Sequence, residues 1–185
     1  MFNELIAFIK YPVYRKEHDL PVASKAFYMV KLTLFCICIS IGLSLVIAFL
    51  EEMLNLELGK HAIDDLLSGY SVLGIFFFAV ILAPFLEELV FRGPLVWFRH
   101  SSYFRPIFYL IALLFGYIHI TNFELSTTVL LLSPLLVAPQ ISVGLLLGVI
   151  RIKFGLSWSM ATHALYNLIL LTPFMLMKIL NIPLE

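Results

Sequence analysis

The chain has 185 residues, of which 62% are hydrophobic and 13% are charged, and its formal net charge at pH 7 is zero. This composition is far too apolar for a soluble globular domain. The neutral charge and the absence of a basic stripe also exclude nucleic acid as an expected partner. We therefore expect an integral membrane protein.

The first 25 residues mix apolar and charged side chains and lack a small-residue cleavage site after a continuous apolar segment. They do not resemble a cleaved signal peptide. We expect residues 1–25 to form a short interfacial helix and a cytoplasmic lead-in. The other expected parts are a first span with an acidic outer loop (26–65), a membrane core (66–177) and a C-terminal tail (178–185).

Five stretches contain no Asp, Glu, Lys or Arg, and they cover residues 32–50, 66–86, 106–123, 125–150 and 154–177. Each is close to or above the ~20 residues that a spanning helix needs. Long unbroken apolar runs favour helices over the alternating strands of a barrel. The sequence predicts an all-α integral membrane protein with about five transmembrane helices, within a range of four to six. Residues 125–150 could be one bent span or a span with a re-entrant piece.

The basic residues predict the orientation of this bundle. If the N-terminus is cytoplasmic, nine of the twelve basic residues lie on the cytoplasmic side, which satisfies the positive-inside rule. These nine are Lys10, Arg15, Lys16, Lys25, Lys31, Arg99, Arg105, Arg151 and Lys153.

Several polar residues fall inside the predicted spans. Ionisable groups cost roughly 2.5–3.5 kcal/mol each at the centre of a spanning helix, so they are rare there and usually mark function. The residues concerned are Glu87, Glu88, Arg92, His119, His163 and, one helical turn after His163, Asn167.

Glu87, His119 and His163 lie in three different spans but at a similar depth. Counted from the basic residue at the cytoplasmic end of each span, they are roughly 18, 21 and 15 Å deep at ~1.5 Å per residue. We expect them to meet near the middle of the membrane. We also expect an aqueous cavity that opens toward the cytoplasm.

The two adjacent glutamates are expected to differ in role. Glu88 and Arg92 are four positions apart and face one another on a helix, whereas Glu87 is rotated by about 100°. Arg92 can therefore hold Glu88 as a structural ion pair, which leaves Glu87 free to face the cavity. Pro94 predicts a kink just after Arg92, and Pro84 predicts a distortion just before the glutamates.

Other features have ordinary structural interpretations. The segment 144–148, GLLLG, predicts a small-residue contact between helices of the same chain. We expect Ser157 and Ser159 to cap the helix that carries His163. His61 and His100 are expected to be solvated loop residues.

Three motifs in this order, EELVFR (87–92), FGYIH (115–119) and HALYN (163–167), resemble the CPBP family of intramembrane proteases, also called the CAAX-protease or Abi family. The resemblance covers roughly residues 66–175. It assigns the catalytic group to Glu87, Glu88, His119, His163 and Asn167, with Arg92 and Phe115 as supporting residues.

The resemblance implies hydrolysis of a peptide bond in the membrane by a glutamate-activated water. Glu87 would be the general base, and His119 would hold or polarise the water. His163 and Asn167 would stabilise the oxyanion of the tetrahedral intermediate. Proton abstraction by a carboxylate and donation by imidazole and amide N–H groups are consistent with these roles.

Members of this family are often labelled metalloproteases, and Glu87, His119 and His163 would be the ligands of a zinc ion. The chain has no HExxH motif, and Asn167 is a poor zinc ligand. A metal-free mechanism explains every motif residue, so we favour it over a divalent metal.

The expected partners are the lipid bilayer and a membrane-associated peptide or protein. Family members act on prenylated CAAX proteins, on bacteriocin-related peptides or in self-immunity, and the motifs do not choose among these. The short chain favours a prokaryotic plasma-membrane protein, for which a prenylated substrate is less expected. Two alternatives stay open: a non-catalytic binding or immunity protein on the same fold, and a proton-coupled transporter.

Overall fold

The computed structural model describes residues 2–15 and 20–182. Lys16 and the last three residues of the expected C-terminal tail lie outside the described residues. The elements in chain order are α1 (Phe2–Lys10), α2 (Val22–Leu54), α3 (Ala62–Gly69), α4 (Val72–Ile75), a π-helix (Phe76–Leu82), α5 (Ala83–Phe91), a 3-10 helix (Gly93–Phe98), α6 (Phe104–Ile118), a second 3-10 helix (His119–Asn122), α7 (Thr127–Leu136), α8 (Ala138–Phe154) and α9 (Leu156–Ile179).

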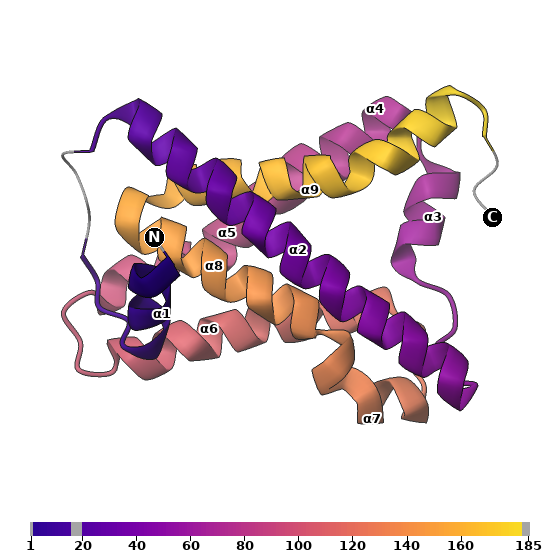
Figure 1. The fold of residues 1–185 in the computed structure, drawn as a ribbon, viewed down its shortest axis with the longest axis horizontal. Helices are drawn as coiled ribbons and strands as arrows, with labels where there is room; N and C mark the ends of the chain where they lie inside the picture. Colours follow the sequence, from indigo (N-terminus) through magenta and orange to yellow (C-terminus); the bar gives the residue numbers. More distant parts are fainter. Residues whose placement is uncertain (1, 16–19, 183–185) are drawn as a thin grey trace.

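Five helical segments of the described chain are long and apolar enough to cross a membrane, which confirms the predicted number of spans. They are Val22–Leu54, Val72–Phe98, Phe104–Asn122, Thr127–Phe154 and Leu156–Ile179. At ~1.5 Å per residue the 33 residues of α2 extend about 50 Å, more than the ~30 Å of hydrocarbon. A helix of this length must tilt or project from the bilayer. Figure 1 shows α2 crossing the bundle diagonally.

The bundle is organised around α8, which packs against α2, α6 and α9. Glycines bring α6 and α8 into close contact. A Cβ on Gly144 would lie 3.0 Å from the Phe115 ring, and one on Gly148 would lie 2.6 Å from the Phe108 ring. The predicted small-residue contact is therefore present, and it lies between two helices of the same chain.

The second span is irregular around both of its prolines. Before Pro84, the residues Phe76–Leu82 form a π-helix, and after Arg92 the chain continues as a 3-10 helix that has Pro94 in its first turn. Proline lacks the N–H that an α-helix needs and its ring crowds the preceding turn, which accounts for both departures from α-helical geometry. The predicted kink after Arg92 is confirmed.

The fourth span consists of two helices, α7 and α8, separated by Val137. Pro134 lies inside α7 and Pro139 lies in the first turn of α8. Figure 1 shows α7 turned away from the axis of α8. The segment is therefore bent at Val137.

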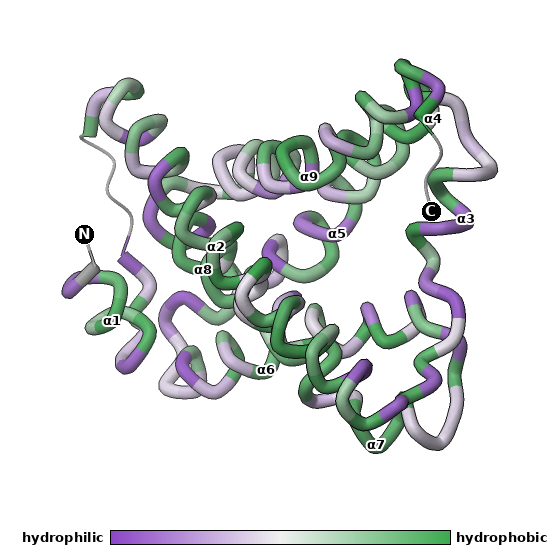
Figure 2. Tube along the Cα trace, turned by 45° about the vertical axis from the view of Figure 1, so that its right-hand side comes forward, coloured by the Kyte–Doolittle hydropathy of each residue, from purple (hydrophilic) through white to green (hydrophobic). Residues whose placement is uncertain are grey.

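The two ends of the bundle differ in how they are filled. At the end that holds α1 (Figure 1), large side chains form what we call the plug cluster. It consists of Leu95, Phe104, Phe108 and Ile152, all buried, with Phe8 and Tyr14 packed against them. We call this end the α1 face. The opposite end, formed by α3 and the C-terminal ends of α2, α6 and α9, is called the α3 face. Figure 2 shows apolar colouring along most of the long helices and hydrophilic stretches at α1, at α3 and on α5.

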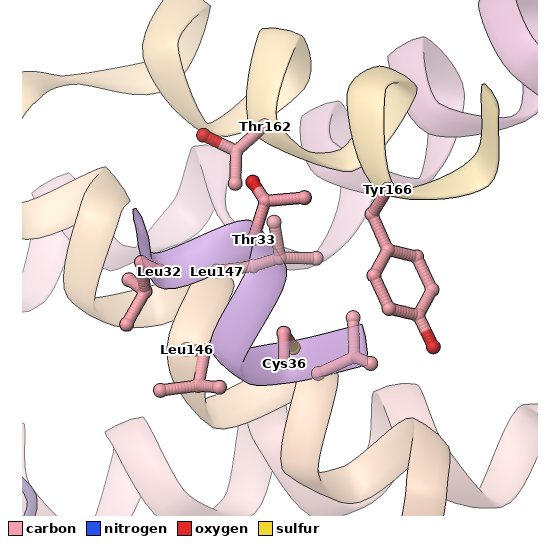
Figure 3. Close-up of a pocket in the computed structure, with 8 residues that line it drawn as sticks. Leu32, Thr33, Cys36, Leu146, Leu147, Thr162 and Tyr166 are labelled. Atoms are coloured by element: carbon pink, nitrogen blue, oxygen red, sulfur yellow. The ribbon is translucent and has the colours of Figure 1, made fainter. Parts of the chain in front are cut away.

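A small cavity of about 10 Å³ lies where α2, α8 and α9 meet (Figure 3). The hydroxyl of Thr33 donates to the Met29 carbonyl and that of Thr162 donates to the Trp158 carbonyl. Both hydroxyl protons are thus used within their own helices, and the volume is about that of one water probe. We interpret this cavity as a packing gap between helices and not as a ligand site.

Gly116→Ala tests the contact between α6 and α8. Its Cβ would lie 2.2 Å from Ile141 Cγ1 and 3.0 Å from the Ile141 backbone nitrogen, so the two helices must separate. We expect a loss of about 1–3 kcal/mol in the free energy of unfolding, measured by thermal or denaturant unfolding in detergent. Gly42→Ala on α2 is the matched control, because no atom lies within 4 Å of its added Cβ. Equal stability of the two variants would contradict the packing argument.

Candidate active site

Glu88 lies in the interior of the bundle and is 0% exposed. Its Oε1 is 3.0 Å from Arg92 Nη1 and 3.2 Å from His163 Nδ1, and its Oε2 accepts a hydrogen bond from the Ser159 hydroxyl. An uncompensated carboxylate would be very costly at this position. Three donors, one directly after α5 and two on α9, therefore stabilise it, and the predicted pair with Arg92 is present.

Arg92 is 1% exposed, and residues of two other spans, α6 and α8, contact its guanidinium. Nη2 donates to the Gly144 carbonyl at 3.2 Å, and the guanidinium carbon lies 3.8 Å from the centroid of the Phe115 ring. The Arg92 carbonyl in turn accepts a hydrogen bond from Arg151 Nε at 2.9 Å. A cation on an aromatic face is favourable, and more so away from water. Phe115 is therefore the surface against which Arg92 is held.

Phe115 also places both histidines. Its ring centroid is 4.9 Å from that of His119 and 5.7 Å from that of His163. Its carbonyl oxygen lies 2.7 Å from His119 Nδ1. One phenylalanine thus links the buried ion pair to the two imidazoles, which explains physically why an aromatic residue stands four positions before His119.

Glu87, His119 and His163 meet at the centre of the bundle. Glu87 Oε2 lies 4.0 Å from His119 Nε2 and 3.8 Å from His163 Nε2. The Glu87 side chain is 29% exposed, in contrast to Glu88, as expected from the 100° rotation between them. The predicted meeting of three spans is thus observed, although α5 ends just after Glu87 and does not continue to Phe98.

The hydrogen-bond partners of the two Nδ1 atoms determine which nitrogen of each neutral imidazole carries the hydrogen. A carbonyl and a carboxylate can only accept, so His119 Nδ1 donates to Phe115 and His163 Nδ1 donates to Glu88. In each neutral ring Nε2 then carries a lone pair. Two imidazole lone pairs and one carboxylate oxygen therefore face one another, and Glu87 Oε2 makes no hydrogen bond with the described residues.

The π-helix places Asn167. The N–H of Ala83 bonds to the Phe78 carbonyl five positions back, and not to Ala79 as in an α-helix. Pro84, the next residue, has no N–H to donate. The Ala79 carbonyl is thereby left without a helical partner, and it accepts a hydrogen bond from Asn167 Nδ2 at 2.8 Å. This fixes the amide plane and leaves the second amide N–H for another acceptor.

A cavity of about 600 Å³ contains the polar side chains of Glu87, His119, His163 and Asn167. The other lining residues come from the half of the bundle at the α3 face and include Ala62, Leu66, Asn122, Gln140, Leu171 and Phe174. No described residue of the plug cluster lines it. The cavity opens toward the α3 face, so the expected opening toward the end that holds Arg99, Arg105 and Lys153 is wrong.

His61, expected to be a solvated loop residue, also lines this cavity. Its Nδ1 accepts the N–H of Ile63 and its backbone N–H donates to Asp64, which caps α3. Its ring packs edge-on against Phe123 with centroids 4.7 Å apart. Burial lowers the pKa of His61 below its ordinary value, and the N–H that Nδ1 accepts requires that nitrogen to be unprotonated.

Neither Ser157 nor Ser159 caps α9, so that prediction is wrong for both serines. The N-cap of α9 is Gly155, which has φ of +105°, and Ser159 lies inside the helix with no exposed surface. Its hydroxyl lies within hydrogen-bonding distance of Glu88 Oε2 and, at 3.0 Å, of the Leu147 carbonyl. Its spacing of four residues before His163, which places both on one helix face, was the only signal in the sequence.

The donor types around Glu87 suit zinc, but their spacing does not. Two ligands at about 2.0–2.1 Å from a tetrahedral zinc lie about 3.4 Å apart, whereas the measured separations from Glu87 Oε2 are 3.8 and 4.0 Å. Within residues 2–15 and 20–182, no group of three His, Cys, Asp or Glu side chains is placed to hold a metal ion. The arrangement thus differs from that of a metal centre.

Arg92→Met tests the buried ion pair. It leaves Glu88 without its cation, and we expect a loss of about 3–5 kcal/mol in unfolding free energy. Adding Glu88→Gln to the same chain removes the uncompensated charge, so the double variant should recover most of that loss. Arg99→Met, at an exposed position of the same segment, should change stability by less than about 0.5 kcal/mol. Additive effects of the two substitutions would contradict the pairing.

A protein-family model described as type II CAAX prenyl endopeptidase Rce1-like matches residues 69–169, more than half of the chain. No curated protein and no solved structure matches the chain. The matched segment contains the buried ion pair of Glu88 and Arg92. It also contains Glu87, His119 and His163, whose side chains meet. The chain belongs to the Rce1-like family of type II CAAX prenyl endopeptidases.

Proposed function

We propose that this protein is an intramembrane endopeptidase in which Glu87 activates a water molecule to hydrolyse a peptide bond. The observation that carries the proposal is the convergence of Glu87 Oε2 with two imidazole Nε2 atoms at 3.8 and 4.0 Å inside a cavity of about 600 Å³. All three atoms accept hydrogen bonds and none of them can donate to another. A water molecule has two donors and fits such a set of acceptors.

In this mechanism the water donates one hydrogen to Glu87 and the other to His119 Nε2. Glu87 takes the first proton as the water oxygen forms a bond to the peptide carbonyl carbon. Glu87 then gives that proton to the amide nitrogen, the C–N bond breaks, and an amine and a carboxylic acid are released. His119 holds the water in line, because Phe115 fixes its Nδ1–H and its ring plane.

The oxyanion that forms on the carbonyl oxygen needs donors, and two residues near it can supply them. The free N–H of Asn167 can point to it while the other stays on Ala79. His163 can donate from Nε2 once Glu87 has passed it the proton taken from the water, and it returns that proton to Glu87 before the amide nitrogen is protonated. The contact between its Nδ1 and the Glu88 carboxylate stabilises the imidazolium formed in between.

Glu88 has a positioning role in this mechanism. It does not line the cavity, and Arg92, His163 and Ser159 occupy its oxygens. It orients the His163 ring and balances its charge. Family membership and five spans support a location in a membrane. We propose a membrane-associated peptide or protein as the substrate and a prokaryotic plasma membrane as the setting.

Glu87→Gln tests the role of the base. The amide cannot take a proton, so cleavage of a membrane peptide by the purified protein in lipid should fall by at least about 100-fold. The wild-type rate should persist in a strong chelator, since the proposed mechanism uses no metal. Glu4→Gln, at an exposed position on α1, is the matched control and should retain the wild-type rate.

Two results would change this assignment. Loss of wild-type activity in chelator, restored by zinc, would make Glu87, His119 and His163 metal ligands. Full cleavage by a folded Glu87→Gln variant would sink the proposal for Glu87 itself. A peptide that binds to the wild type but stays uncut under all conditions would indicate a binding protein on the same fold.

Ser159→Ala tests whether the orientation of Glu88 and His163 matters for the reaction. The cavity wall is unchanged, because Ser159 does not line it, so KM should stay the same. Loss of a donor to Glu88 shifts the His163 ring, and we expect kcat to fall between about 10- and 100-fold. Ser157→Ala, an exposed serine in the first turn of α9, is the control. A change in KM alone would assign Ser159 to substrate binding.

A further inference from the structure

The cavity at Glu87 holds a second buried oxygen, which the proposed chemistry does not use. Gln140, the only glutamine of the chain, lies in the first turn of α8 and lines the cavity. Its Oε1 is buried and makes no hydrogen bond with the described residues. Among the described side chains that line the cavity, Glu87 and Gln140 are the two that carry a buried oxygen of this kind.

The unpaired oxygen of Gln140 destabilises the free protein. Folding has taken it from water and has supplied no donor in exchange. An apolar side chain of the same length would avoid that cost. Nearby polar side chains are paired: the Ser142 hydroxyl donates to the Ala138 carbonyl, and Asn167 donates to the Ala79 carbonyl. A donor that arrives with a ligand would satisfy Gln140 in the same way.

Gln140 lies at the level of His119 in the bundle. Helices α6 and α8 run in opposite directions, since Gly148 packs against the first half of α6 and Ile141 packs against Gly116 near its end. Gln140 precedes Ile141, and His119 directly follows α6. The two side chains are therefore within about one helical turn of each other along the bundle axis. A peptide with its cleaved bond at His119 also lies beside Gln140, which lines the same cavity.

A carboxamide matches the main chain of an extended peptide. In an extended strand the N–H and the C=O of one residue point to the same side and can pair with one partner. The oxygen of Gln140 accepts such an N–H, and its NH₂ group donates to such a carbonyl. The bond between Cγ and Cδ has a broad rotational preference, so a small turn of the carboxamide presents Oε1 to the cavity. Such a contact recognises the backbone of a substrate and not its side chains.

We propose, on the basis of the peptidase function above, that Gln140 is a substrate-binding residue that pairs with the main chain of an extended peptide beside the cleaved bond. An extended chain advances about 3.3 Å per residue, so the paired residue lies within a few positions of that bond. The contact involves no reacting atom, so it is equally strong before and during the reaction. It therefore lowers KM and leaves kcat unchanged.

Gln140→Met tests this contact with a fluorescent, mostly apolar membrane peptide in lipid. Met has a similar length and no strong hydrogen-bonding group, so KM should rise about tenfold with kcat unchanged. The unfolding temperature in detergent should equal or exceed that of the wild type, because the unpaired oxygen is gone. Ser142→Ala, on the same helix but outside the cavity lining, is the control and should keep the wild-type KM. A lower unfolding temperature, or a fall in kcat alone, overturns the proposal.

Depsipeptides identify the part of the substrate that Gln140 contacts. In each of them one main-chain N–H away from the cleaved bond is replaced by an ester oxygen. At one position the wild type should lose about tenfold in kcat/KM, because Oε1 is again left without a donor. The same replacement should reduce kcat/KM of Gln140→Met by less than about twofold. An equal loss in the two proteins at every position contradicts the proposed contact.

Binding of the same peptides to the Glu87→Gln protein reads the contact without turnover. Addition of Gln140→Met should weaken binding of the unmodified peptide about tenfold, and the ester at the sensitive position should remove that difference. Equal affinities of the single and double variants for the unmodified peptide overturn the proposal even if the wild type cleaves it. A tenfold difference for a peptide that the wild type binds but never cleaves supports the contact and refutes the peptidase function.

Discussion

One carboxylate at the centre of an apolar bundle fixes the positions of four of the five spans. Glu88 is stabilised only if Arg92 from its own span and Ser159 and His163 from α9 all reach it. Arg92 in turn needs the Phe115 ring of α6 and a carbonyl of α8. A polar network of this kind is stabilising when complete and costly when incomplete. The relative rotation and depth of these helices are thus constrained by charge as well as by packing.

The sequence predicted the features that depend on local geometry or on the bilayer. Apolar runs of the right length gave five spans, because hydrocarbon thickness sets a minimum length. The Glu88 and Arg92 pair followed from a spacing of four on a helix, and the kink after Arg92 followed from Pro94. The meeting of Glu87, His119 and His163 was predicted from their similar depths in three spans. The distances between their side chains follow only from the structure.

The features that it missed depend on helix rotation and on long-range packing. Ser159 looked like a residue at a helix start, and its contact with Glu88, 71 positions away, requires knowledge of how α9 is turned. His61 lines the cavity because Phe123, far along the chain, packs against its ring. The direction of the opening depends on which end the large side chains fill, and the apolar runs at both ends of each span look alike.

Because Phe76–Leu82 form a π-helix, the geometry of the site depends on the number of residues in this segment. In an α-helix each residue turns the chain by about 100°, and the wider turn accommodates an additional residue without rotating α5 away from the cavity. Deleting one of Phe76, Phe77 or Phe78 would allow α-helical bonding, in which the Ala83 N–H takes the Ala79 carbonyl and α5 keeps its rotation relative to α4. A change of length in this segment would therefore release Asn167 from the Ala79 carbonyl, even with every side chain of the site intact.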